Sequence, residues 1–217
     1  MKHFKGLLPF INRHLGGQNR HTMSAAELAV CTDSVPVLWH EPFIEHLASI
    51  LRPKVYVELG LYRCGLFNRV IPYAQQLIGV DMDAEAGKCM AKSDKVRFVN
   101  SSTDEFAAIL RANPIAIDML FIDADHAKDA VLRDFWNFLP FVSAHGIIIL
   151  HDTHPKNIEN TTPGRCNDAY KAAEELSRMT DGFEMMSLPV HPGMTLCRKR
   201  RVQLSWMEPN EEKKCPS

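Results

Sequence analysis

The chain has 217 residues, of which 46% are hydrophobic and 24% charged, so we expect one soluble globular domain. Its 25 lysines and arginines balance 26 aspartates and glutamates, which gives no global positive field to attract nucleic acid or an anionic membrane. No apolar run approaches the roughly 20 residues that a spanning helix needs, so no membrane partner is expected. Six scattered cysteines without a CxxC pair favour reduced thiols in a cytoplasmic protein.

Three regions follow one another along the chain. Residues 1–53 read as a helical N-terminal extension packed on the core, in which Ser24 could cap a short helix that runs through Cys31. Pro42 stands at an early position of a second helix. The apolar face of that helix would hold Phe43, Ile44, Leu47 and Ile50. Residues 54–200 carry the main domain, and residues 201–217 form a polar tail.

The main domain alternates short apolar runs with helical patterns. The runs, each of strand length, are residues 55–59, 77–81, 96–99, 117–123 and 146–150. Nearly continuous apolar runs are typical of parallel strands buried on both faces. Helical spacing between and after the runs is shown by Val131, Leu132, Phe135, Phe138 and Leu139, and by Ala169, Ala172, Ala173 and Leu176. The pattern predicts a doubly wound α/β sheet.

Two further β segments follow at the end of this domain. Residues 183–188 and 194–198 flank a turn that contains Pro192 and Gly193. This arrangement predicts an antiparallel hairpin at the end of the parallel sheet.

Polar residues stand at the carboxyl end of every predicted parallel strand, which is where open parallel sheets bind ligands. Gly60 and Gly65 flank the turn after the first strand, and Asp81 ends the second strand, 21 residues after Gly60. An acidic residue at that distance suits the hydroxyl groups of a ribose, so a nucleotide-type ligand is indicated. The turn is not GxGxxG, which disfavours a dinucleotide, and a plain turn with a surface aspartate stays an alternative.

Asp123 and Asp152 end the fourth and fifth strands, which are usually neighbours in such a sheet. Two converging carboxylates repel one another unless a cation lies between them, and oxygen ligands suit Mg²⁺, Mn²⁺ or Ca²⁺. His126 opens the next helix and could act there as a general base. The alternatives are capping and ion-paired aspartates with a surface histidine. His151 and His154 more often have structural roles at such positions.

The segment from Pro155 to Cys166 follows the fifth strand and reads as a loop above this edge of the sheet. Loops in that position often select the substrate. Arg165 could pair there with an acidic group of a substrate, although a surface arginine is the more ordinary interpretation.

The motifs together resemble class I S-adenosylmethionine-dependent methyltransferases, in particular the small-molecule O-methyltransferases that include macrolide-sugar O-methyltransferases and cephalosporin-hydroxylase-like proteins. The stretches that carry the resemblance are VYVELGLYRCGLF (55–67), LIGVDMD (77–83), VRFVNSSTDEF (96–106), LFIDADHAKDAVLRDFWNFLP (120–140) and GIIILHDTH (146–154). The resemblance implies a Rossmann-like sheet of seven strands in the order 3-2-1-4-5-7-6, with strand 7 antiparallel. It also implies methyl transfer to a hydroxyl group of a small molecule.

The resemblance implies roles for particular residues. The cofactor S-adenosylmethionine would be bound by Glu58, Gly60, Leu61, Tyr62, Gly65, Asp81, Met82, Ser102, Thr103 and Asp123. Within this set the first loop would face the methionine part, Asp81 the ribose, and Ser102 and Thr103 the adenine. Asp123 and Asp152 would bind a divalent cation, Mg²⁺ by expectation, and His126 would act as the catalytic base beside Asp123. Cys64 stands where relatives commonly have glycine, which suggests a tighter loop.

Other functions remain open at this point. An NAD-dependent oxidoreductase shares the strand-turn-helix unit and Asp81, and a metal-dependent hydrolase could use Asp123, His126 and Asp152. A methyltransferase-like fold can also serve as an inactive binding partner. The sequence identifies neither the acceptor nor an oligomeric state, so a homo-oligomer is left open.

Overall fold

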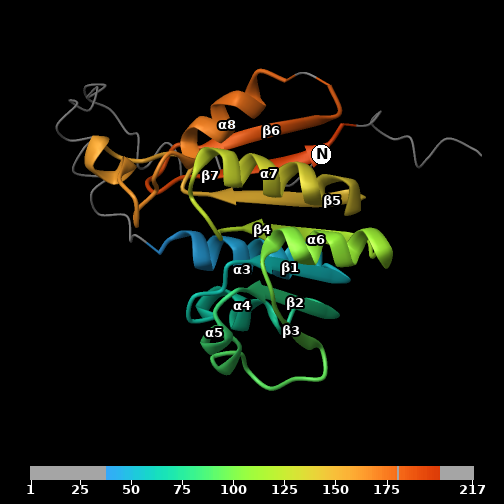
Figure 1. Cartoon of the computed structure of the whole chain (residues 1–217). Helices are drawn as coiled ribbons and strands as arrows, with labels where there is room; N and C mark the ends of the chain where they lie inside the picture. The colour runs from blue at the N-terminus through green and yellow to red at the C-terminus, as the bar shows by residue number, and fades with distance from the viewer. Residues whose placement is uncertain (1–37, 180, 201–217) are drawn as a thin grey trace, which may run out of the picture. The chain divides into compact units, whose positions relative to one another are not determined.

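Seven strands form one mixed sheet in the structure, a computed structural model that describes residues 38–179 and 181–200 (Figure 1). The sheet has the order β3-β2-β1-β4-β5-β7-β6. Its strands are β1 (Val55–Leu59), β2 (Gln76–Asp81), β3 (Val96–Asn100), β4 (Ile117–Ile122), β5 (Val142–His151), β6 (Phe183–Leu188) and β7 (Met194–Lys199). Strands β1 to β5 pair in parallel, whereas β7 runs antiparallel to both β5 and β6. The expected order, the antiparallel seventh strand and the terminal hairpin are therefore confirmed.

Helices cover both faces of this sheet. One face carries α6 (Thr103–Ala112), α7 (Lys128–Phe138) and α8 (Ala169–Ser177), of which α6 and α7 lie in front of the strands in Figure 1. The other face carries α3 (His40–Leu51), α4 (Gly65–Val70) and α5 (Ala84–Lys88). Short 3-10 turns occupy Leu139–Phe141 and Ile158–Thr161. No helix within the described ranges is long and apolar enough to cross a membrane.

The alternation of side chains along each strand explains the two packed layers. In β1, Val57 and Leu59 belong to the core under α6 and α7, whereas Tyr56 packs with α3 and α4. Because both faces are buried, the central strands read as continuous apolar runs. This is the layered α/β architecture that the sequence predicted.

Several predictions differ from the structure in detail. Strand β3 is only half-buried because it lies at the sheet edge with one neighbouring strand, so burial on both faces was wrong there. Strand β5 begins at Val142 rather than Gly146, and its pairing with β4 is irregular between Val142 and Ile147. Ile50 is 64% exposed because α3 instead buries His40, Ile44 and Ala48, which recur every fourth residue.

Helix boundaries also differ. Leu139 lies in a 3-10 turn after α7, and His126 precedes this helix, which begins at Lys128. All four predicted apolar residues of α8 are buried. The predicted helix Ser24–Cys31 and the polar tail at residues 201–217 lie outside the described residues.

The strand register brings the polar strand ends to one edge. Leu59 pairs with Val80 on one side and with Ile122 on the other, and Ile122 pairs with Leu150. The residues that follow these pairs therefore lie level with one another across four adjacent strands. This alignment positions the candidate site.

Candidate active site

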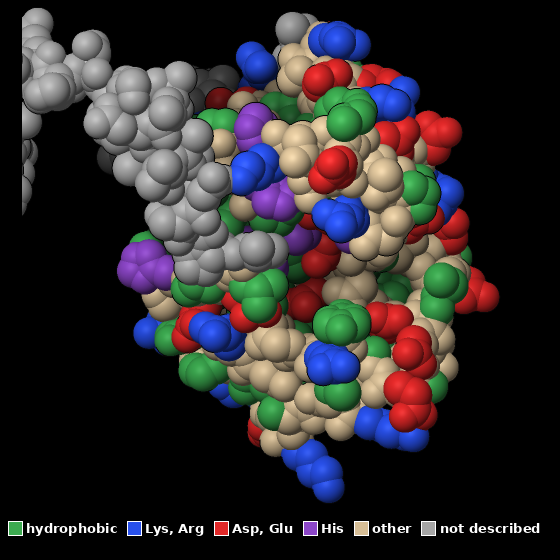
Figure 2. Space-filling model, turned by 90° about the vertical axis from the view of Figure 1, so that its left-hand side faces the viewer, with side chains coloured by type: hydrophobic (Ala, Val, Ile, Leu, Met, Phe, Trp, Pro, Cys, Tyr) green, Lys and Arg blue, Asp and Glu red, His purple; other side chains and the backbone are tan. Residues whose placement is uncertain are grey.

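A cavity of about 530 Å³ opens at the carboxyl ends of the parallel strands. It is lined by the residues that follow β1, β2, β4 and β5 and by the beginning of α3. Seen from this side, acidic and histidine side chains gather around a hollow (Figure 2). The volume is in the range of small-molecule and cofactor sites.

Gly60 allows the close approach of two strand ends at the floor of the cavity. Its φ of +85° is left-handed, and a Cβ built there would overlap the carbonyl oxygen of Asp123. Its amide donates to the carbonyl oxygen of Val80 at 2.9 Å, and the Asp123 amide donates to that of Leu59 at 2.9 Å. A side chain at position 60 would push the turn after β1 away from β4. The glycine thus leaves room that a ligand can use.

The rest of this turn is also unusually shaped. Tyr62 and Cys64 have φ values of 47° and 56°, in the left-handed region that non-glycine residues rarely adopt. Cys64 precedes α4, and its thiol donates to the carbonyl oxygen of Ala86 at 3.2 Å. The Cys64–Gly65 step is thus accommodated by a left-handed residue tied to α5, in keeping with the tighter loop that the sequence suggested. Tyr62 is 81% exposed, so its side chain projects into solvent at the cavity mouth.

Asp81 is held rigidly at the end of β2. One carboxylate oxygen accepts from the Leu61 amide at 2.9 Å, and the other accepts from the Asp83 amide at 2.8 Å. These bonds fix the carboxylate where the cavity meets a second one, and each oxygen retains a lone pair. Asp81 is therefore preorganised to accept hydrogen bonds from a ligand, as the ribose assignment requires.

Glu58 is a buried acid in the cavity wall, with 2% exposure. Tyr56, two residues earlier on the same face, donates its hydroxyl to Glu58 at 2.5 Å. Burial raises the pKa of Glu58 well above its usual value, with the charge of Asp123 adding to the effect and the Tyr56 hydrogen bond opposing it. A cationic ligand group beside Glu58 would favour its ionised form.

A second cavity of about 200 Å³ shares Gly60, Asp81 and Ala124 with the first. Met82, Ser102 and Thr103 line it, and the resemblance implies that the last two lie near the adenine. Ser102 caps α6 through a reciprocal capping box with Glu105, so its side chain is engaged within the protein. The hydroxyl of Thr103 is also engaged, because it donates to Asp134 of α7 at 2.6 Å. Asp134 was not found by the sequence analysis.

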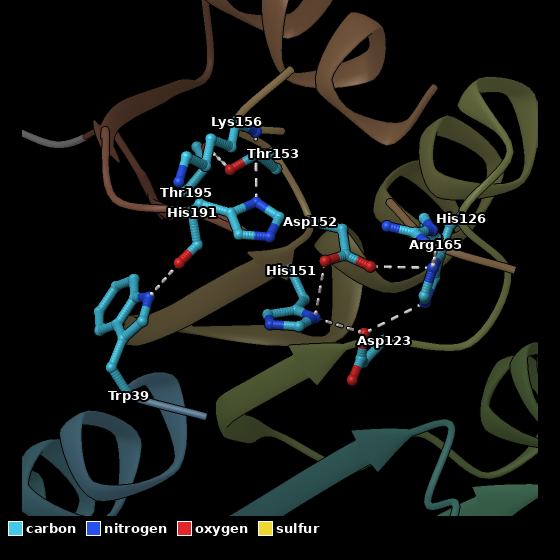
Figure 3. A network of polar contacts seen from close by, with 10 residues as sticks. All are labelled: Trp39, Asp123, His126, His151, Asp152, Thr153, Lys156, Arg165, His191 and Thr195. Carbon is cyan, nitrogen blue, oxygen red and sulfur yellow. Dashed lines mark hydrogen bonds and ion pairs between the residues drawn. The ribbon is translucent and has the colours of Figure 1, made fainter. Parts of the chain in front are cut away.

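Asp123, His126, His151 and Asp152 point toward one another at the ends of β4 and β5 (Figure 3). Nδ1 of His126 lies 2.8 Å from an oxygen of Asp152, and its Nε2 lies 3.3 Å from an oxygen of Asp123. That same Asp123 oxygen lies 2.8 Å from Nδ1 of His151. Asp152 turns its carboxylate inward from a left-handed backbone with φ of 59°. The predicted proximity of the two aspartates and His126 is present.

The histidines and carboxylates of this cluster neutralise one another. Hydrogen bonds to Asp123 and Asp152 raise the pKa of His126 to about 11. Burial of Asp123 would raise its pKa, but the neighbouring His151 and His126 hold it well below its usual value. The pKa of His151 is also raised, because Asp123 outweighs the opposing effect of burial. With both ring nitrogens engaged, His126 is a bound imidazolium in this arrangement.

Asp123, His126 and Asp152 could also hold a divalent cation. One ligand atom of each lies within 4.8 Å of the others, which suits a common ion. Two carboxylates and one imidazole are donors that Mn²⁺ accepts as well as Mg²⁺. The residues therefore fit a metal site, in which a cation would compete with His126 for the same carboxylate oxygens.

His151 belongs to the cluster, which the sequence analysis did not predict. Its Nδ1 faces Asp123, while its Nε2 is buried and has no hydrogen-bond partner among the described residues. The ring lines the large cavity, with ring centroids 4.2 Å from His40 and 5.8 Å from Phe121. A histidine directly before a site aspartate, at the end of a buried strand, was the signal in the sequence.

The loop after β5 reaches the cluster through two residues. The carbonyl oxygen of Arg165 lies 2.6 Å from Nδ1 of His126, and the buried thiol of Cys166 is hydrogen-bonded to Asp152. The Arg165 side chain is exposed, which agrees with its interpretation as a surface arginine. His154 is not part of the cluster; it is exposed, and its amide donates to the carbonyl oxygen of Pro192.

Comparison with known proteins shows what this chain is similar to. Residues 57–153 match the model of a protein family described as a methyltransferase domain. An uncharacterized protein, R132 of Acanthamoeba polyphaga mimivirus, is 30% identical over 129 residues, which are 52% of this chain and 58% of that protein. The chain thus spans somewhat more than half the length of this curated relative.

Solved structures share the fold. An O-methyltransferase from Bacillus cereus, in complex with S-adenosylhomocysteine (SAH), superposes with a TM-score of 0.64 at 12% identity, over 90% of this chain and 97% of that one. The SAH-bound methyltransferase PaMTH1 of Podospora anserina superposes with a TM-score of 0.61 at 16% identity, over 93% of this chain and 98% of that one. These matches confirm the Rossmann-like methyltransferase fold that the resemblance implied. Residues 57–153 are thus similar to a methyltransferase domain, and the chain shares the seven-stranded fold of these solved methyltransferases.

Proposed function

We propose that the protein transfers a methyl group from S-adenosylmethionine to a hydroxyl group of a small molecule. The observation that carries this proposal is that one cavity is lined both by Glu58, Gly60 and Asp81 and by Asp123, His126 and His151. A cofactor held by the first set would thus face the acid–base groups of the second. Relatives with this fold include an O-methyltransferase crystallised with SAH.

The chain's residues divide the work of such a reaction. When bound, S-adenosylmethionine supplies an electrophilic methyl group on a sulfonium. Glu58 lies where a carboxylate stabilises the positive charges of the methionine part, and Asp81 is fixed to accept from the ribose. Positioning the acceptor oxygen in line with the methyl group would supply much of the rate enhancement.

The acceptor hydroxyl must also lose its proton. His126 is the base that the resemblance implies, but both of its nitrogens are engaged by carboxylates. His151 lines the cavity, and its buried Nε2 has no hydrogen-bond partner among the described residues, while Asp123 orients the ring through Nδ1. We therefore propose that His151 accepts the proton of the acceptor hydroxyl while His126 bridges the two carboxylates. When His126 is released from them, His126 accepts this proton instead.

A divalent cation is part of the proposal. Asp123, His126 and Asp152 would hold it, and a bound cation would lower the pKa of the acceptor hydroxyl. The segment from Pro155 to Cys166, which touches His126 and Asp152, would border the acceptor. A cytoplasmic location and a homo-oligomer stay proposals as well.

The test is calorimetric titration of the metal-stripped protein with SAH, with NAD as the control ligand. We expect micromolar binding of SAH and none of NAD, because the turn after β1 is shaped around Gly60 rather than GxGxxG. Absence of SAH binding with and without Mg²⁺ would contradict the cofactor assignment.

The same preparation tests the cation. Titration with Mg²⁺ and with Mn²⁺ should give saturable binding to the wild type and none to Asp152→Asn, which keeps the left-handed backbone that asparagine tolerates. SAH affinity should be nearly the same in both proteins. Equal metal binding by Asp152→Asn would remove Asp152 from the metal site.

A further inference from the structure

A third cavity, of about 420 Å³, lies beside β3 at the edge of the sheet. Strand β3 pairs with β2 alone and is the last strand at the lower end of the sheet in Figure 1. The cavity is bordered by the beginnings of β2 and β3 and by the end of α6, whereas Asp81 and Thr103 stand at the opposite ends of β2 and α6. It shares no lining residue with the two cavities of the candidate active site and is therefore a separate feature.

Most of the residues that line this third cavity are apolar. Phe106 and Leu110 of α6 and Ile78 of β2 are buried, and Ile115 is half-buried. Ile109, directly before Leu110, is 43% exposed, so α6 presents an aliphatic side chain to water at this cavity. A ligand with an alkyl chain would remove this apolar surface from water, which is favourable in proportion to the area covered.

The charged residues of the lining favour an anion, because Lys95 and Arg97 outnumber Asp94 there. Arg97 lies on the α6 face of β3, since it alternates with Val96 and Phe98, which pack on the other face. Its guanidinium makes no hydrogen bond or ion pair with any residue of 38–179 or 181–200. A guanidinium presents paired donors that match a carboxylate. The cavity thus combines apolar surface with a cation that has no partner in the described part of the chain.

We propose that this third cavity binds an amphipathic carboxylate, a molecule with one linear alkyl chain and one carboxylate end, such as a fatty acid of medium length. The carboxylate pairs with the guanidinium of Arg97, and the alkyl chain covers Ile109 and the apolar residues beside it. A volume of about 420 Å³ is in the range of small-molecule sites and suits one short chain rather than the two long chains of a phospholipid. The proposal does not depend on the proposed function, because it uses none of the residues of the candidate active site.

The first experiment titrates the wild type with hexanoate, octanoate and decanoate by calorimetry. Affinity should rise about fourfold for each added methylene group, because each one is buried against the apolar lining. Decyltrimethylammonium has the same chain as decanoate with the opposite charge, and it should bind at least about tenfold more weakly. Absence of saturable decanoate binding, or equal affinities for decanoate and decyltrimethylammonium, would overturn the proposal.

Two variants locate the bound decanoate. Arg97→Gln removes the cation and should lower decanoate affinity at least about tenfold. Its matched control is Arg111→Gln on α6, where the arginine donates to Asn137 at 2.7 Å and does not line the cavity, so the affinity should be unchanged. Ile109→Glu places a carboxylate beside the bound one and should abolish binding. Ala108→Glu is the control for that change, because Ala108 is exposed on the same helix outside the lining.

Unchanged decanoate affinity in either Arg97→Gln or Ile109→Glu would overturn the proposal, because the ligand would then lie elsewhere on the protein. Both side chains are exposed, so the variants should fold, and circular dichroism checks this. If Ile109→Glu does not fold, Ile109→Asn removes the aliphatic surface without adding a charge and should still weaken decanoate binding several-fold.

Discussion

Asp134 shows at the residue scale how a buried carboxylate can lower the stability of its own fold. Burial raises its pKa to about 6, with the Thr103 hydrogen bond and Arg133 opposing the shift and with Asp104 and Asp125 adding to it. A group whose pKa is raised on folding binds its proton more tightly in the folded chain. Stability therefore falls as pH rises from the unfolded value of 3.8 to about 6.

The variant Asp134→Asn should be stabilised relative to the wild type above that window. The difference in free energy of unfolding should grow between about pH 4 and pH 6 and level off at up to about 3 kcal/mol. Urea unfolding of the cofactor-free proteins at pH 4.5 and pH 7.5 measures it. A difference that stays constant with pH would show that the Asp134 carboxyl does not titrate in this range.

His126 illustrates how carboxylates fix a protonation state. Its pKa of about 11 follows from hydrogen bonds to Asp123 and Asp152, so the metal-free protein should carry an imidazolium there at pH 8. Nitrogen NMR of ¹⁵N-histidine protein should show both nitrogens of His126 protonated at that pH. The variant Asp152→Asn removes one charge and should lower this pKa.

The His126 signal can be assigned with His126→Asn, in which it disappears. A neutral His126 in the wild type at pH 8 would contradict the bridging arrangement, and would return the base role to His126 without any need for release.

At the scale of elements, α3 acts as a side wall of the large cavity. The indole of Trp39, just before the helix, donates to the carbonyl oxygen of His191 in the β6–β7 turn at 2.8 Å. Glu41 pairs with Arg69 of α4, and Ile44 and Ala48 are fully buried. Leu38, His40 and Glu41 line the cavity. The start of α3 is therefore fixed beside the cavity by its contacts with the β6–β7 turn and with α4.

The variant Trp39→Phe keeps an aromatic ring beside Phe43 but removes the indole donor. It should lower the free energy of unfolding by about 1 kcal/mol and weaken SAH binding several-fold. Trp136→Phe is the control, because Trp136 lies on α7, packs on Phe183 and does not line the cavity. Equal SAH affinities in both variants would show that α3 does not shape the ligand site.

The elements also show why some of the site could be read from the sequence. Asp123 and Asp152 were predicted to meet because they end neighbouring parallel strands, and strand neighbours fix the positions of their ends. Asp134 could not be placed that way, since its position at the cavity depends on how α7 packs against α6. Its signal was a charged residue within the apolar stripe that includes Val131 and Phe138.

At the scale of the whole molecule, the strand order was more predictable from the sequence than the boundaries of individual strands and helices. The strand order follows from the resemblance, and the hairpin of β6 and β7 follows from its turn and flanking segments. The burial of strand β3 was overestimated because a short apolar run does not reveal that a strand lies at the edge of the sheet. His151 was given a structural role because the direction of its unused nitrogen depends on the tertiary contacts of His40 and Phe121.

The turn at Gly60 has an evolutionary consequence. Since any Cβ there would overlap the Asp123 carbonyl, each side chain at position 60 would separate the ends of β1 and β4 and so deform both cavities at once. Substitution of Gly60 is therefore expected to disturb the part of the protein that we assign to the cofactor, whichever residue replaces it. A change of acceptor would then arise elsewhere, and the mostly exposed loop after β5, which meets the cluster through Arg165 and Cys166, is a part that can vary.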